Sequence, residues 1–153
     1  MNIDSNGRIY FLIAVMTWML IACSSDTHLS ADPNNKQQVA MGKNLYDKHC
    51  AACHGVNLEG QANWRKRGDD GRLPAPPHDD SGHTWHHPDQ MLFEIIRDGM
   101  VPPHAPDNYV TDMQGWGDVL SGEQIWAILA YIKSRWSEES LRVQKDIDDK
   151  ARQ

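Results

Sequence analysis

The stretch KHCAACHG, from Lys48 to Gly55, places two cysteines and a histidine at the spacing C-x-x-C-H. Cys50 and Cys53 at this spacing suit three kinds of chemistry: a redox dithiol, half of a zinc site, or the attachment of a haem. Two such thiols reach the vinyl groups on one edge of a haem, and His54 then lies under the iron as a ligand. Zinc would need two further ligands. The candidates are His78, His83, His86, His87 and His104.

Length and composition limit these choices. The chain has 153 residues, which suits a single domain, and 40% of them are hydrophobic and 24% charged, as in ordinary globular proteins. The long aliphatic side chains are sparse for a self-sufficient core, so we expect something else to fill its centre. The formal net charge of −6 argues against nucleic-acid binding, which needs a basic surface.

The first 22 residues are typical of an export signal. The apolar run IYFLIAVMTWMLIA, from Ile9 to Ala22, is shorter than the roughly 20 residues of a membrane-spanning helix and suits the hydrophobic region of a signal peptide. The alternative is an uncleaved anchor that tilts or thins the bilayer. We therefore predict that residues 1–22 do not belong to the folded domain.

The third cysteine follows that run directly. The sequence Leu20-Ile21-Ala22-Cys23 resembles a bacterial lipobox, in which the cysteine is lipidated and becomes the first mature residue. Several acyl chains hold a protein to a membrane almost permanently. Ser24, rather than an aspartate, follows the cysteine, which resembles sorting to the outer membrane in a source with two membranes. Residues 23–35 then form a polar tether on the exported side, in the periplasm.

The remaining pattern is helical, with no sign of a βαβ unit. We predict a first helix from Asn34 or Asn35 to His49, an amphipathic segment over 88–99, and a last helix within 120–136 that Ser121 and Gln124 cap. Residues 137–153 read as a charged helical extension. A thioredoxin-like dithiol would lie in a βαβ unit, so an all-α pattern argues against it. Export to an oxidising compartment also disfavours a zinc site, because its thiolates are easily oxidised there.

Two segments together resemble a known family. GKNLYDKHCAACHG and MQGWGDVLSGEQIWAILAYIKSRW, in this order, look like a class I c-type cytochrome, specifically the monohaem variants of exported bacterial cytochromes. The resemblance implies a cytochrome c fold over residues 36–136, in which the N- and C-terminal helices cross and long loops wrap one haem. Gly42 and Tyr46 match the first helix where it crosses the last.

The same resemblance implies the ligands of one covalently attached haem c. Cys50 and Cys53 are the thioether attachments, His54 is the fifth ligand of the iron and Met113 the sixth. Met100, in IIRDGMVPPHAP, is the alternative sixth ligand, although its position does not match the family. In this family a proline carbonyl also accepts the Nδ1 proton of the proximal histidine. Pro76 is our choice for that role, with Pro74 and Pro77 as alternatives.

The long polar segment from Val56 to His87 would normally count against a compact domain. A haem offers two large apolar faces, so loops can wrap it and still bury enough surface. Trp64, Trp85 and Trp116 are candidate wall residues of that pocket. The same segment contains a cluster of basic residues: Arg65, Lys66, Arg67 and Arg72. They form a solvated surface, or one of them pairs with a haem propionate.

These observations predict a monomeric one-electron carrier, not an enzyme, that is lipid-anchored on the exported side of a bacterial membrane and serves unidentified redox proteins. Two alternatives stay open. A haem enzyme or sensor would have a labile sixth ligand. A copper-handling module would use His83, His86 and His87.

Overall fold

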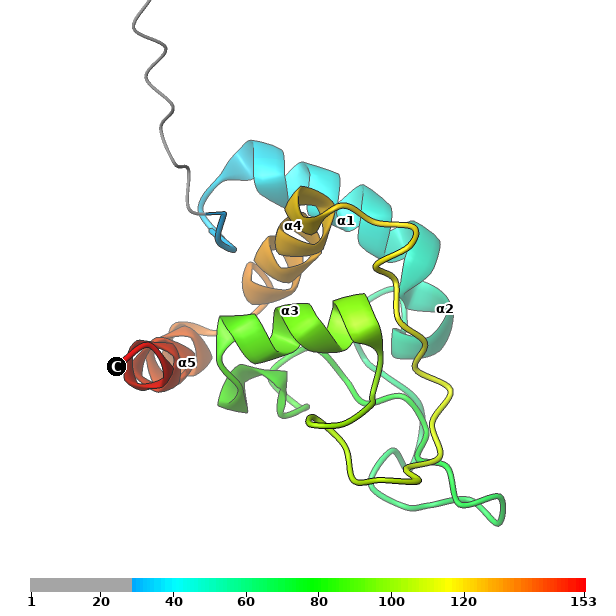
Figure 1. Cartoon of the computed structure of the whole chain (residues 1–153). Coiled ribbons are helices and arrows are strands. Elements are labelled where there is room, and N and C mark those ends of the chain that lie inside the picture. Colours follow the sequence, from blue (N-terminus) through cyan, green and yellow to red (C-terminus); the bar gives the residue numbers. More distant parts are fainter. Residues whose placement is uncertain (1–28) are drawn as a thin grey trace, which may run out of the picture.

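A computed structural model describes residues 29–153 (Figure 1). The predicted signal peptide, Cys23 and the start of the tether lie outside these residues. Within the described part the structure is helical and has no strand, apart from one isolated antiparallel bridge. In the same part of the chain, no helix is both long enough and apolar enough to cross a membrane. The predicted all-α fold is confirmed.

Local capping signals set where the two principal helices begin. Helix α1, Lys36–His49, starts at Asn35, whose side chain accepts hydrogen bonds from the backbone N–H groups of Gln37 and Gln38. Helix α4, Gly122–Lys133, starts at Ser121 with a capping box, in which Gln124 Oε1 accepts from Ser121 N at 2.9 Å. These side chains satisfy backbone donors that a helix end leaves free.

Helices α1 and α4 pack against each other and form the centre of the core. Their crossing depends on Gly42, because a Cβ atom there would lie 1.8 Å from the carbonyl oxygen of Ala127. At Gly42 the backbone of α1, without a side chain, therefore lies directly against the backbone of α4. Tyr46, one turn further along α1, is completely buried, and its ring packs on that of Tyr131 with centroids 5.3 Å apart.

Two shorter helices and long loops complete the domain (Figure 1). The single turn α2, Ala51–His54, follows α1, and α3, Asp89–Asp98, packs on α4. A 3-10 turn, η1, covers Thr84–His86. Between α2 and η1 the chain forms only turns and bends, yet it is held at specific points: His78 N donates to Leu58 O, and Trp136 Nε1 donates to His78 O.

The charged extension forms α5, Glu138–Ala151, and docks through polar side chains together with Leu141, which packs against the hydrophobic core cluster. Its buried residues, Ser140, Gln144 and Asp148, recur every four positions and so lie on one face. Asp148 accepts from the first backbone N–H of α3, and Gln144 donates to Asp89. The Asp89 carboxylate also pairs with Lys133 of α4 at 2.7 Å, which links three helices.

The end of the predicted tether is also packed against the domain. Gln38 of α1 donates to Ser30 O at 2.8 Å and accepts from Asp32 N at 2.9 Å. Ala31 between them is 7% exposed and belongs to the hydrophobic core cluster. Residues 30–35 thus form the entry to α1.

We expect Gly42→Ala to lower the free energy of unfolding by about 3 kcal/mol, because the new methyl group meets backbone that cannot move aside. Gly122→Ala in α4 is the matched control, since its Cβ would meet only the Phe93 ring, at 3.6 Å, an ordinary contact distance. Denaturant unfolding followed by circular dichroism measures both. Equal stability of the two variants would contradict the close crossing.

Candidate haem site

The C-x-x-C-H residues lie where α1 ends. Cys50 closes α1 with its N–H bonded to Tyr46 O, and the turn of α2 then brings His54 N within 2.9 Å of Cys50 O. Cys50 and Cys53 are one helical turn apart and are not joined by a disulfide. Cys50 is half-buried, Cys53 is exposed, and His54 is buried with 7% of its surface exposed. The sequence motif is therefore a compact local unit.

The turn after His54 is fixed by glycine and tyrosine. Gly55 has φ +82°, a conformation that other residues rarely adopt, and it ends α2. The hydroxyl of Tyr46 lies 3.2 Å from Gly55 O and 3.4 Å from His54 O, and donates toward these two carbonyls. Tyr46 thus connects the helix crossing to the backbone of the motif.

The thiol environment argues against redox or zinc chemistry. Burial, with a smaller contribution from Cys53, raises the pKa of the Cys50 thiol to about 12. A reactive dithiol needs the opposite, a thiolate favoured by a lowered pKa. Among residues 29–153, no group of three or more histidine, cysteine or carboxylate side chains is placed to hold a metal ion. This finding also leaves the copper alternative at His83, His86 and His87 without support from the structure.

One ring nitrogen of His54 is bound to the backbone of a distant segment. Its Nδ1 lies 2.9 Å from the carbonyl oxygen of Pro76, which is the hydrogen bond that the sequence analysis expected of Pro76 rather than of Pro74 or Pro77. A carbonyl only accepts, so Nδ1 carries the proton and Nε2 keeps its lone pair. Burial lowers the pKa of His54, and the bond to Pro76 offsets this only in part. A neutral imidazole with a free Nε2 is the form that binds iron.

His78 lies directly against His54, a contact that the sequence analysis did not predict. The two imidazole rings are stacked, with centroids 3.9 Å apart and planes inclined by 19°. Burial lowers the pKa of His78 well below its ordinary value, and the neighbouring His54 adds to this effect. His78 Nδ1 is buried and has no hydrogen-bond partner among residues 29–153.

The two candidate sixth ligands lie side by side. Gly99 and Gln114 form the isolated antiparallel bridge, and Met100 N lies 3.4 Å from Met113 O. Both methionines are half-buried. The structure therefore brings Met100 next to Met113, which the sequence spacing did not indicate.

The segment after Met113 is tied to both α3 and α1. Trp116 N donates to Ile96 O at 2.9 Å. The Trp116 ring also meets that of His49 edge-on, with centroids 4.9 Å apart. His49 directly precedes Cys50, so the predicted sixth-ligand segment is joined to the end of α1.

The predicted wall residues are not equivalent. Trp85 and Trp116 are packed against the core cluster. Trp64 instead stacks on His83 at 5.6 Å, with the guanidinium of Arg65 3.9 Å from its ring centroid. We therefore place Trp64 in a surface stack.

A few buried polar side-chain atoms lack a hydrogen-bond partner in the described part of the chain. Within residues 29–153, three such atoms have no hydrogen-bond partner: Arg72 Nε, His78 Nδ1 and Trp85 Nε1. Arg72 Nε still lies 2.9 Å from a carboxylate oxygen of Asp112, close in sequence to Met113. Buried donors are almost always paired in folded proteins. Of these three residues, Arg72 is the one tied to the segment of Met113, so it is the residue that would pair with a haem propionate.

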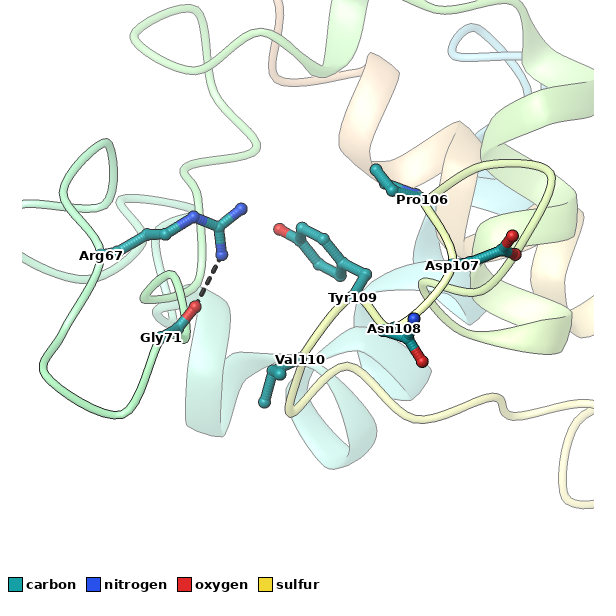
Figure 2. A pocket seen from close by; sticks show the side chains of 7 residues that line it. All are labelled: Arg67, Gly71, Pro106, Asp107, Asn108, Tyr109 and Val110. Carbon is teal, nitrogen blue, oxygen red and sulfur yellow. Dashed lines mark hydrogen bonds between the residues drawn. The ribbon is translucent and has the colours of Figure 1, made fainter.

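An open surface pocket of about 330 Å³ lies between the loop that carries Arg67 and the loop of residues 106–110 (Figure 2). Arg67 donates to Gly71 O at 2.7 Å, and its guanidinium lies over the Tyr109 ring, 5.1 Å from the centroid. Arg67 is the one basic residue in its lining, which also contains Asp107. The structure thus gives Arg67 partners within the protein.

Comparison with known proteins agrees with this geometry. Residues 39–136 match the family Cytochrome c. The chain belongs to this family. Membership gives it a covalently bound haem c, and one C-x-x-C-H motif means one haem. The match covers every residue of the site described above, from Tyr46 to Trp116.

Two curated relatives are similar over 117 residues. They are the proteins named Cbb3-type cytochrome c oxidase subunit FixP from Rhizobium meliloti (strain 1021), 30% identical, and from Sinorhizobium medicae (strain WSM419), 28% identical. The matched region is 74% of this chain and 36% of each relative, so the chain spans about a third of their length. No solved structure matches the chain.

Replacing both Cys50 and Cys53 by alanine should abolish covalent attachment, because the thioethers are the bonds that survive denaturation. The expected result is that acid-acetone extraction removes all haem from the double variant and none from the parent protein. Cys53→Ala alone should retain haem through one thioether, with an altered haemochrome spectrum. Covalent haem in the double variant would contradict the assignment of these cysteines.

Proposed function

We propose that the protein is a one-electron carrier whose haem iron is bound by His54 on one side and Met113 on the other. The observation that carries this proposal is the hydrogen bond from His54 Nδ1 to Pro76 O, at 2.9 Å, because it leaves Nε2 free for iron. The haem supplies the Fe(III)/Fe(II) couple. The chain supplies the ligands, excludes water from them and holds them in place.

Histidine and methionine together suit electron transfer rather than catalysis. The soft thioether sulfur favours Fe(II) and raises the reduction potential. If His54 and Met113 both bind the iron, it would have no open position for oxygen or a substrate. The contacts of Trp116 with Ile96 and His49 tie the Met113 segment to α3 and α1.

Replacing Met113 by alanine should remove the sulfur-to-iron charge-transfer band of the oxidised protein, lower its reduction potential and allow the reduced protein to bind carbon monoxide. Met100→Ala is the matched control, since Met100 is half-buried next to Met113 on the paired segment. Its charge-transfer band should remain. Optical spectra of both haem-loaded variants make the measurement. Loss of the band in Met100→Ala alone would transfer the ligand role to Met100.

We also propose that the carrier works on the exported side of a bacterial membrane, in the periplasm, held by lipid on Cys23. The support is the apolar run before Cys23 and its likeness to a lipobox. The relatives that share this domain are named as subunits of a Cbb3-type cytochrome c oxidase, so we propose a terminal oxidase assembly as redox partner. A net charge of −6 favours encounter with a basic docking face.

Cys23→Ala should release the protein from the membrane, because a lipobox without its cysteine cannot be acylated. We expect the parent protein to be found in the membrane fraction and to be labelled with radioactive palmitate. The variant should lose the label. Ser24→Ala, which keeps the cysteine, is the control and should still be labelled. An unlabelled parent protein would exclude the lipid anchor and leave the haem assignment intact.

A further inference from the structure

The imidazole of His78 occupies a position that the rest of the fold imposes. Its backbone is held on both sides, since His78 N donates to Leu58 O at 2.8 Å and Trp136 Nε1 donates to His78 O at 2.7 Å. Leu58 is fully buried and Trp136 is 6% exposed. The Tyr46 ring meets the His78 ring edge-on, with centroids 6.0 Å apart. The His78 side chain therefore has little freedom to move away from His54.

This arrangement restricts His54 in a way that its hydrogen bond does not. The bond to Pro76 O fixes one atom of the His54 ring, but the ring can still rock about that contact. A flat ring stacked on its face, at 3.9 Å and 19°, opposes such movement. The two contacts together define both the direction of Nε2 and the plane of the imidazole.

We propose that His78 is a positioning residue that sets the plane of the His54 imidazole in the haem protein, and with it the electronic asymmetry of the iron. The inference rests on the proposed role of His54 as an axial ligand. The plane of an axial imidazole decides which iron d orbital its π electrons meet. Rotating that plane alters the magnetic anisotropy of ferric haem without changing the ligand set.

Stability alone does not account for a histidine at this position. Its Nδ1 is buried without a hydrogen-bond partner in the described part of the chain, and an unpaired buried polar atom opposes folding. An apolar side chain of similar size would avoid that loss. The feature that leucine cannot supply is a flat ring against His54.

The experiment compares haem-loaded protein with three single substitutions. His78→Leu removes the flat ring, and His78→Phe keeps one. His86→Leu is the matched control, since His86 is an exposed histidine that contacts Trp85 and not His54. Electron paramagnetic resonance of the ferric proteins gives the g values. Nuclear magnetic resonance gives the paramagnetic shifts of the haem methyl groups.

We expect all three variants to retain covalent haem. His78→Leu should change the g values and the spread of the methyl shifts, while His78→Phe and His86→Leu stay close to the parent protein. If His78→Leu does not accumulate with haem, His78→Gln, which also lacks a ring, carries the same expectation. Parent-like spectra in the ringless variant would overturn the inference, as would an equal change in His78→Phe.

The experiment distinguishes failure of this positioning role from failure of the proposed function. A parent protein without covalent, histidine-ligated haem would overturn the proposed function itself. A normal parent spectrum, together with spectra of the His78 variants that do not differ from it, would overturn only the positioning role.

Discussion

The crossing of α1 and α4 at Gly42 is the constraint on which the site depends. Because a Cβ at Gly42 would lie 1.8 Å from the carbonyl oxygen of Ala127, the helices meet at a distance that glycine alone permits. That contact fixes the end of α1, and with it the motif from Cys50 to His54. Tyr46 connects the helix crossing to this motif, since its ring packs against α4 and its hydroxyl donates toward the carbonyls of His54 and Gly55.

Features determined by neighbouring residues could be predicted from the sequence. The side chains of Asn35 and Ser121 cap helices because their partners lie two or three positions away. The turn from Cys50 to His54 is equally local. Gly42 and Pro76 were predicted from the likeness to a family, and the structure has the close crossing at Gly42 and the hydrogen bond from His54 to Pro76.

Contacts between distant segments could not be predicted in this way. The buried residues of α5 are polar, and Gln144 reaches Asp89 on another helix, a contact that the sequence of the extension does not indicate. The stacking of His78 on His54 depends on backbone contacts to Leu58 and Trp136, which no periodicity shows. The pairing that brings Met100 beside Met113 likewise joins segments on either side of a loop, which no periodicity shows.

The central claim is that one haem, held by His54 and a methionine, carries one electron at a time. Spectroscopically monitored redox titration of the protein, matured in a host that attaches haem c, tests this claim most directly. We expect one covalent haem per chain, low-spin spectra in both oxidation states and a single reversible wave with the slope of one electron. A protein without covalent haem, or with a high-spin reduced state, would contradict it.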